Sequence, residues 1–145
     1  MYENSQNSMG GGCYLTTIIS QILGYPDNNY YLNTLRKFRD TKMTPNPNYL
    51  IHLITYDVIG PYIANELRND KNNKEIATLY FNECITKAVT AIEENKDEQA
   101  INIYIAMTNS LAKRYNIDTN ILMLQVDEID TKSLGHGKIK KKVLI

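Results

Sequence analysis

The chain has 145 residues, of which 43% are hydrophobic, and its 16 basic residues balance its 16 acidic ones. This length and composition fit one globular domain that buries a core without disulfides or metals. The balanced charge excludes the basic character of a typical nucleic-acid-binding protein, and two widely separated cysteines, Cys13 and Cys84, exclude a disulfide framework or a zinc quartet.

Residues 1–12 are predicted to form a flexible leader, because they are polar, end in three glycines and lack apolar periodicity. They have neither the positive start nor the apolar centre of a signal peptide. No run approaches the 18 consecutive apolar residues of a membrane span. We therefore expect a cytoplasmic protein without membrane contact.

Residues 13–116 are predicted to form a mainly α, compact domain of about five helices. The first covers residues 13–23, where apolar residues recur at helical spacing, and the Gly24 that follows is a helix stop. Its Tyr, Thr and Ile content leaves a buried strand as the alternative. A second helix is expected over residues 29–43 and ends before Pro45.

A third helix is predicted over residues 48–58, and the Gly60-Pro61 pair is expected to break it. Pro61 suits the first position of a new helical turn. The same pair is also typical of a kink that redirects a helix. The polar residues 69–73 are predicted to form a loop.

Two longer helices are predicted over residues 74–95 and 97–115, and their short connection favours an antiparallel pair. The apolar stripe of the first contains Ile76, Tyr80, Cys84, Ala88 and Ile92. The stripe of the second contains Ala100, Tyr104, Met107, Leu111 and Tyr115. Cys84 is interpreted as a small core side chain.

The last part of the chain, residues 117–145, is predicted to be either a strand pair or a basic tail. Residues 121–126 and 138–144 each resemble a short strand. A dense charge run consists of Lys138, Lys140, Lys141 and Lys142. These lysines are the one part of the chain expected to bind nucleic acid, if any does, and we favour a solvated strand edge whose charges oppose aggregation.

Three sequence blocks stand out in register along the chain. They are Gly12–Thr17 (GCYLTT), Leu35–Asp40 (LRKFRD) and Tyr56–Ala64 (YDVIGPYIA). In this order and spacing they resemble the CFI-box family of small bacterial domains, although Tyr14, Leu15 and Thr16 stand where that family usually has Phe, Ile and Ala. The resemblance covers about residues 10–93 and implies a fold without naming a reaction.

Cys13 is the candidate catalytic residue. It follows three glycines at a predicted helix start, where free backbone N–H groups and the helix dipole favour a thiolate. The alternative, which we favour, is a small buried side chain. His52 lies in an apolar run and is interpreted as a core or half-exposed residue, not as the base of a thiol–imidazole pair.

A second candidate site combines the start of the first helix with an arginine pair on the second. Arg36 and Arg39 lie three positions apart on a helix and can clamp an anion, or one of them can form a structural ion pair with Asp40. A helix start rich in free N–H groups is a natural anion site. The predicted ligand-binding residues are Gly12, Thr16, Thr17, Arg36, Arg39 and Asp40.

These features support three functional hypotheses. The first is a non-catalytic interaction module, an adaptor or inhibitor of a larger protein, because no acid/base set is recognisable and the helices carry many tyrosines. The second is an enzyme or redox sensor that uses Cys13. The third is a binder of a phosphate- or nucleotide-like anion at Gly12-Cys13 with Arg36 or Arg39. No cofactor or metal is expected, and self-association is left open.

Overall fold

The computed structural model describes residues 14–117, and within them the chain forms helices and turns without a strand. The mainly α fold predicted from the sequence is therefore confirmed for this range. The elements are α2 (Tyr14–Ile22), α3 (Tyr30–Phe38), η2 (Arg39–Met43), α4 (Pro47–Arg68), α5 (Asn73–Tyr80), η3 (Phe81–Ile85), α6 (Thr86–Glu93) and α7 (Asp97–Arg114). The predicted leader and the predicted strand pair or tail after residue 117 lie outside the described residues.

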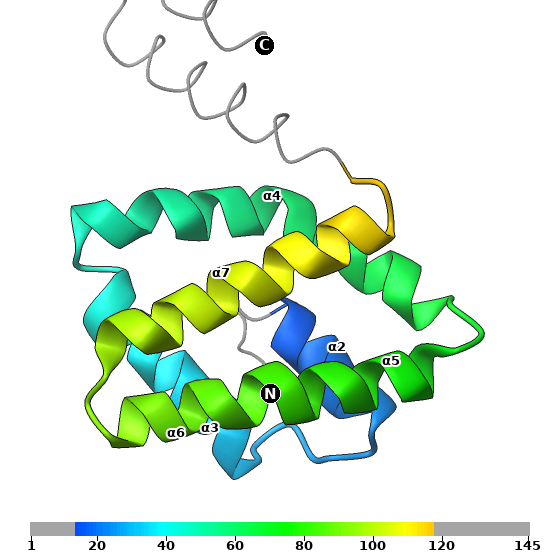
Figure 1. Ribbon diagram of the computed structural model, residues 1–145, viewed down its shortest axis with the longest axis horizontal. Helices are drawn as coiled ribbons and strands as arrows, with labels where there is room; N and C mark the ends of the chain where they lie inside the picture. Colours follow the sequence, from blue (N-terminus) through cyan, green and yellow to red (C-terminus); the bar gives the residue numbers. More distant parts are fainter. Residues whose placement is uncertain (1–13, 118–145) are drawn as a thin grey trace, which may run out of the picture.

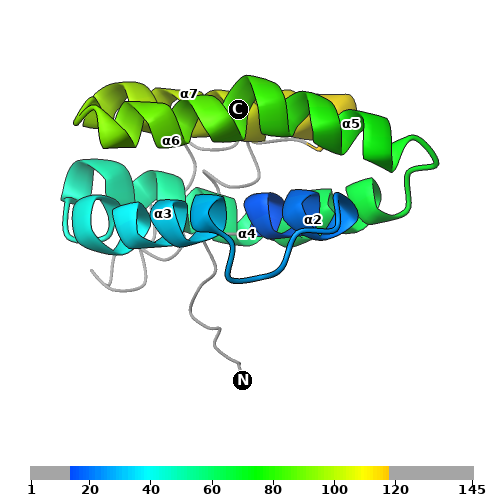
Figure 2. The ribbon, with the colours of Figure 1, turned by 90° about the horizontal axis from the view of Figure 1, so that it is seen from below.

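The helices form two layers (Figure 2). One layer contains α2, α3 with its continuation η2, and α4, and the other contains α5, η3, α6 and α7. The core lies between the layers, and Leu15 and Ile19 of α2 are completely buried in it. The predicted antiparallel pair is present, because α6 and α7 are joined by a short turn and pack against each other (Figure 1).

Sharp stops at the ends of three helices set the directions of the connecting turns. Gly24, Asn95 and Asn116 have positive φ angles of 84°, 61° and 56°. In each case the next amide donates to a carbonyl five positions back, at 2.8–3.0 Å. This is the Schellman arrangement, which Gly and Asn favour because they tolerate the left-handed conformation. The predicted stop after the first helix is thus confirmed.

The break predicted at Gly60-Pro61 is wrong, because α4 continues as one helix from Pro47 to Arg68. Pro61 has no N–H to donate to the carbonyl of Asp57, a loss that costs about 3 kcal/mol in a helix interior. Figure 1 shows the ribbon of α4 changing direction along its course, as a proline kink would produce. Ile59 and Ile63, on either side of the pair, are both buried in the same core, and this packing keeps the helix continuous.

The helix predicted over residues 74–95 is also continuous, but it contains the π-helical turn η3. A π turn adds one residue to the helical repeat. Ile85 is therefore buried where the sequence pattern predicted Cys84, which is only half-buried at the edge of the core. The sequence pattern correctly predicts that Tyr80 and Ala88 are buried. Between them, the buried side chain is that of Ile85 instead of Cys84.

Gly60 lies where Tyr14 of α2 packs closely against the backbone of α4. It is buried, and a Cβ atom placed on it would lie 2.8 Å from Cδ2 and 3.1 Å from Cβ of Tyr14. Such distances are too short for carbon atoms in van der Waals contact. At this crossing a side chain larger than that of glycine would therefore have to displace Tyr14.

We expect Gly60→Ala to lower the free energy of unfolding by about 1–3 kcal/mol, as overpacking typically does. The effect opposes helix propensity, which by itself favours Ala over Gly by about 1 kcal/mol. Urea unfolding measures the change. In a Tyr14→Ala background the ring is absent and the cost should fall by at least about half. An equal cost in both backgrounds would show that the tyrosine ring is not responsible.

Candidate functional site

The predicted site at the start of the first helix is only partly within the described residues. Gly12 and Cys13 lie outside them, and the structure begins at Tyr14. The next backbone N–H, that of Leu15, donates to the hydroxyl of Tyr56 on α4 at 2.5 Å in a buried position. The hydroxyl of Tyr56 therefore pairs with one of the backbone N–H groups that a helix start would otherwise offer to an anion.

The two threonines of the predicted site have different environments. Thr16 is completely buried, beside Leu35, Cys84 and Met107, and has no surface exposed to a ligand in solvent. Thr17 is half-buried, and its hydroxyl accepts a hydrogen bond from Nη2 of Arg36 at 3.5 Å. The expected packing of the second helix across the first thus brings Arg36 to Thr17 but leaves Thr16 inside the core.

Arg36 is bound mainly to the turn between α2 and α3. Its Nη2 atom lies 3.0 Å from Oδ1 of Asp27, and its Nη1 atom donates to the backbone carbonyl of the same residue at 3.0 Å. The carboxylate compensates the charge of the guanidinium group. Arg36 therefore ties a loop to α3, which is a structural task.

Arg39 lies one turn further along, in η2, and has a different carboxylate partner. Its Nε and Nη2 atoms are each 3.0 Å from Oδ1 of Asp40. The Arg39 side chain is 14% exposed, whereas that of Asp40 is 63% exposed. The two arginines of the predicted clamp are thus held by Asp27 and Asp40 respectively.

Asp57 of α4 is an acidic residue near Arg39 that the sequence reasoning missed. Partial burial raises the pKa of its carboxyl group, and the positive charge of Arg39 opposes that rise. A signal was present, since Asp57 is the only charged residue between Tyr49 and Ile63. It did not point to Arg39, because that proximity arises from the packing of η2 against α4.

His52 and Cys84 are the other reactive side chains of the described range that the sequence singles out. His52 is exposed on α4. Burial, with a smaller contribution from the charge of Glu83, raises the pKa of the Cys84 thiol and so disfavours its reactive form. Across residues 14–117, no three His, Cys, Asp or Glu side chains gather in a way that would hold a metal ion. None of the helices in this range is long and apolar enough to cross a membrane.

One hollow in the surface of the described region is a groove between α4 and α7, which we call the α4–α7 groove. It encloses about 370 Å³, including the open space at its mouth. Its apolar lining consists of Met43, Leu53, Tyr56, Tyr104 and Ile105. Sequence reasoning did not find the groove, because it depends on how α4 and α7 pack.

A smaller hollow lies on the other side of Tyr104, between the two layers. It encloses about 300 Å³ by the same measure, and Met43 and Tyr104 line it as well as the α4–α7 groove. Arg39 also contributes to its lining. The ring of Tyr104 packs on that of Tyr56 at a centroid distance of 5.3 Å. The half-buried ring of Tyr104 therefore borders both hollows.

Comparison with known proteins does not assign the chain to a group. No model of a protein family matches it, and neither curated proteins nor solved structures give a significant match. The resemblance to the CFI-box family stays a prediction. The function must accordingly be argued from the surfaces and side chains of the domain itself.

Tyr56→Phe should lower the free energy of unfolding by about 1–3 kcal/mol, because the buried N–H of Leu15 loses its acceptor. Chemical unfolding measures the loss, and hydrogen exchange should show faster exchange of the Leu15 amide. Tyr62→Phe is the matched control, since Tyr62 lies on the same helix and is 66% exposed. If both variants had the same stability, the hydroxyl of Tyr56 would not support the start of α2.

Alkylation of Cys84 should have a pH midpoint above that of an ordinary thiol, because burial raises its pKa. The measurement uses a Cys13→Ser variant, so that one thiol remains, and follows the alkylation rate against pH. Since the thiolate is the nucleophile, the folded protein should react more slowly near pH 8 than the same variant in urea. A folded midpoint at or below the unfolded one would contradict the burial of this thiol.

Proposed function

We propose that the chain is a non-catalytic interaction module, an adaptor or inhibitor that binds a larger protein partner through the exposed side of α4. The observation that carries this proposal is the composition of α4. Between Leu50 and Tyr62 its side chains are mostly apolar on the outer side as well as on the buried side, although it lies along an edge of the domain (Figure 1).

The inner side of α4 belongs to the core. Its buried side chains include Leu53, Tyr56, Ile59, Ile63 and Leu67. Its main packing partners among the described elements are α2, α7 and η2. A helix packed in this way normally turns polar side chains toward water on its other side.

The other side of α4 also carries apolar side chains, beside the exposed His52 and Asp57. The α4 outer face comprises Leu50, Ile51, Ile54 and Tyr62. Leu50 is 39% exposed and Tyr62 is 66% exposed, while Ile51 and Ile54 are half-buried. Ile51 and Ile54 are three residues apart and Tyr62 lies eight residues further on, so all three fall within one stripe of the three- to four-residue helical repeat.

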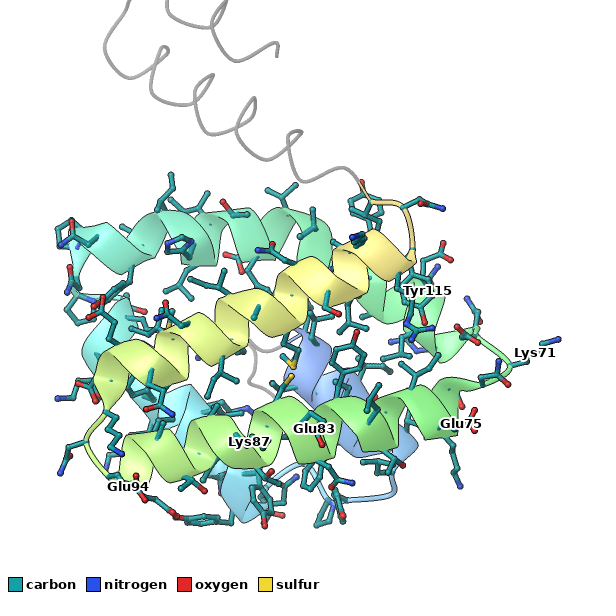
Figure 3. All side chains as sticks on the ribbon, in the orientation of Figure 1. Lys71, Glu75, Glu83, Lys87, Glu94 and Tyr115 are labelled. Carbon is teal, nitrogen blue, oxygen red and sulfur yellow. The ribbon has the colours of Figure 1, made fainter. Side chains whose placement is uncertain are left out.

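The continuous helix of the second layer, formed by α5, η3 and α6, has a charged outer face that contrasts with that of α4. Glu75, Glu83, Lys87 and Glu94 follow one another along α5, η3, α6 and the turn after it (Figure 3). Glu83 and Lys87 form an exposed ion pair at 3.3 Å. Against this background the α4 outer face has the composition of a protein-binding surface, where aromatic and aliphatic side chains replace charges.

The stripe suits a particular kind of partner. An amphipathic helix presents apolar anchors at the same three- to four-residue spacing, and such a helix can lie along α4 with its ridges between those of the stripe. Tyr62 is the natural anchor, since exposed tyrosines often contribute much of the binding energy at interfaces.

The polar groups of the predicted site support binding over catalysis in the described region. Arg36 is bonded to Asp27 and Arg39 to Asp40, so both guanidinium groups serve the packing of their own helices. Thr16 is sealed in the core. These side chains therefore stabilise the fold.

The test places a photo-crosslinking residue at position 50 in the full chain, in an extract of the cells that produce it. We expect one covalent partner, captured in stoichiometric amount. Capture should fall by about tenfold or more when Tyr62→Lys is added, because a charge replaces the apolar anchor.

The matched control carries the crosslinker at Leu79 of α5, which is 49% exposed but lies in the other layer. It should capture little of that partner, and Leu79→Lys should leave capture from position 50 unchanged. Unfolding curves of the lysine variants should agree with the parent within about 0.5 kcal/mol, as for most surface substitutions. The same adducts from positions 50 and 79, or none from position 50, would refute the proposal.

A further inference from the structure

The α4–α7 groove raises a question separate from the α4 outer face, because different residues line it. Besides its apolar floor it carries the polar side chains of His52, Thr55, Thr108 and Asn109. An apolar floor with polar groups beside it suits a peptide segment, whose side chains need apolar contact and whose backbone needs hydrogen-bond partners.

The described chain ends just after α7, one of the two helices that border the groove. After α7 the amide of Ile117 donates to the carbonyl of Ala112 at 2.8 Å, and Asn116 has a positive φ, so the chain turns away from the helix axis. The side chain of Ile117 packs on the core. Figure 1 shows that this turn brings the chain to the side of α7 on which α4 lies.

The chain that follows has the right length to return along the groove. Residues 118–120 span about 10 Å when extended, and residues 121–126 span about 20 Å. Along α7, Thr108 lies about 14 Å from Ile117 at 1.5 Å per residue. A segment that doubles back from Ile117 therefore reaches the stretch of α7 that lines the groove.

We propose that residues 121–126 (ILMLQV) of this same chain occupy the α4–α7 groove. Five of these six residues are apolar and none is charged, so the segment gains from burial in an apolar groove. His52, Thr55 and Asn109 provide hydrogen-bond partners for its backbone. This inference is independent of the proposed partner on the α4 outer face.

The test is disulfide trapping in the full chain with both natural cysteines replaced by serine. A pair of cysteines at Asn109, beside the groove, and Leu124, in the segment, should form a disulfide within one chain. The control pair places the first cysteine at Thr90, an exposed residue of α6, and should oxidise at least about tenfold more slowly, as expected for a distant site. No preference for the Asn109 pair would overturn the proposal.

A mixture of isotopically light and heavy protein identifies the origin of the segment. Bridges within single chains support the proposal, whereas bridges between light and heavy chains show that a second copy fills the groove and overturn it. A second measurement uses the thiol of Asn109→Cys alone. Adding Leu122→Asp and Leu124→Asp should speed its labelling by about tenfold, as for a groove occupied about 90% of the time, and an unchanged rate would also overturn the proposal.

Discussion

The structure depends on the crossing of α2 and α4 at Gly60. The absence of a side chain there lets Tyr14 lie against the α4 backbone, so that α2 reaches the centre of the core. The same crossing brings the hydroxyl of Tyr56 to the buried N–H of Leu15. The ring of Tyr56 then packs between Tyr14, at 6.2 Å, and Tyr104 of α7, at 5.3 Å. The absence of a side chain at Gly60 in the first layer is therefore linked to the contact between Tyr56 and Tyr104 of the second layer.

This arrangement explains why the surfaces of interest belong to α4. Among the described elements, α2, η2 and α7 pack mainly against one side of the helix, and Leu50 and Tyr62 are exposed on the other. The large ring of Tyr104 lies between two hollows instead of filling either, and the α4–α7 groove follows from that packing. The proposed binding role rests on a helix that carries apolar side chains on its outer side and is packed on the other.

The polar interactions mostly hold turns and helix ends in place. Arg36 joins α3 to the turn after α2 through Asp27. At the other end of the domain, the hydroxyl of Tyr115 donates to Asp70 at 2.9 Å, which joins the end of α7 to the turn before α5. The Asn72 amide and this hydroxyl lower the pKa of Asp70. Such pairs fix the ends of helices whose middles are held by apolar packing.

The sequence alone determined where most helices lie, because apolar periodicity, glycine stops and asparagine caps act within one or two helical turns. Four features required the tertiary structure: the continuity of α4 through Pro61, the register change at Cys84, the pairing of Arg36 with Asp27, and the α4–α7 groove. Each depends on packing between segments that are separate in the chain, as the bond between Leu15 and Tyr56 is across 41 positions. Local patterns carry no information on which side chains such packing brings together, and the candidate binding surfaces are defined by that packing.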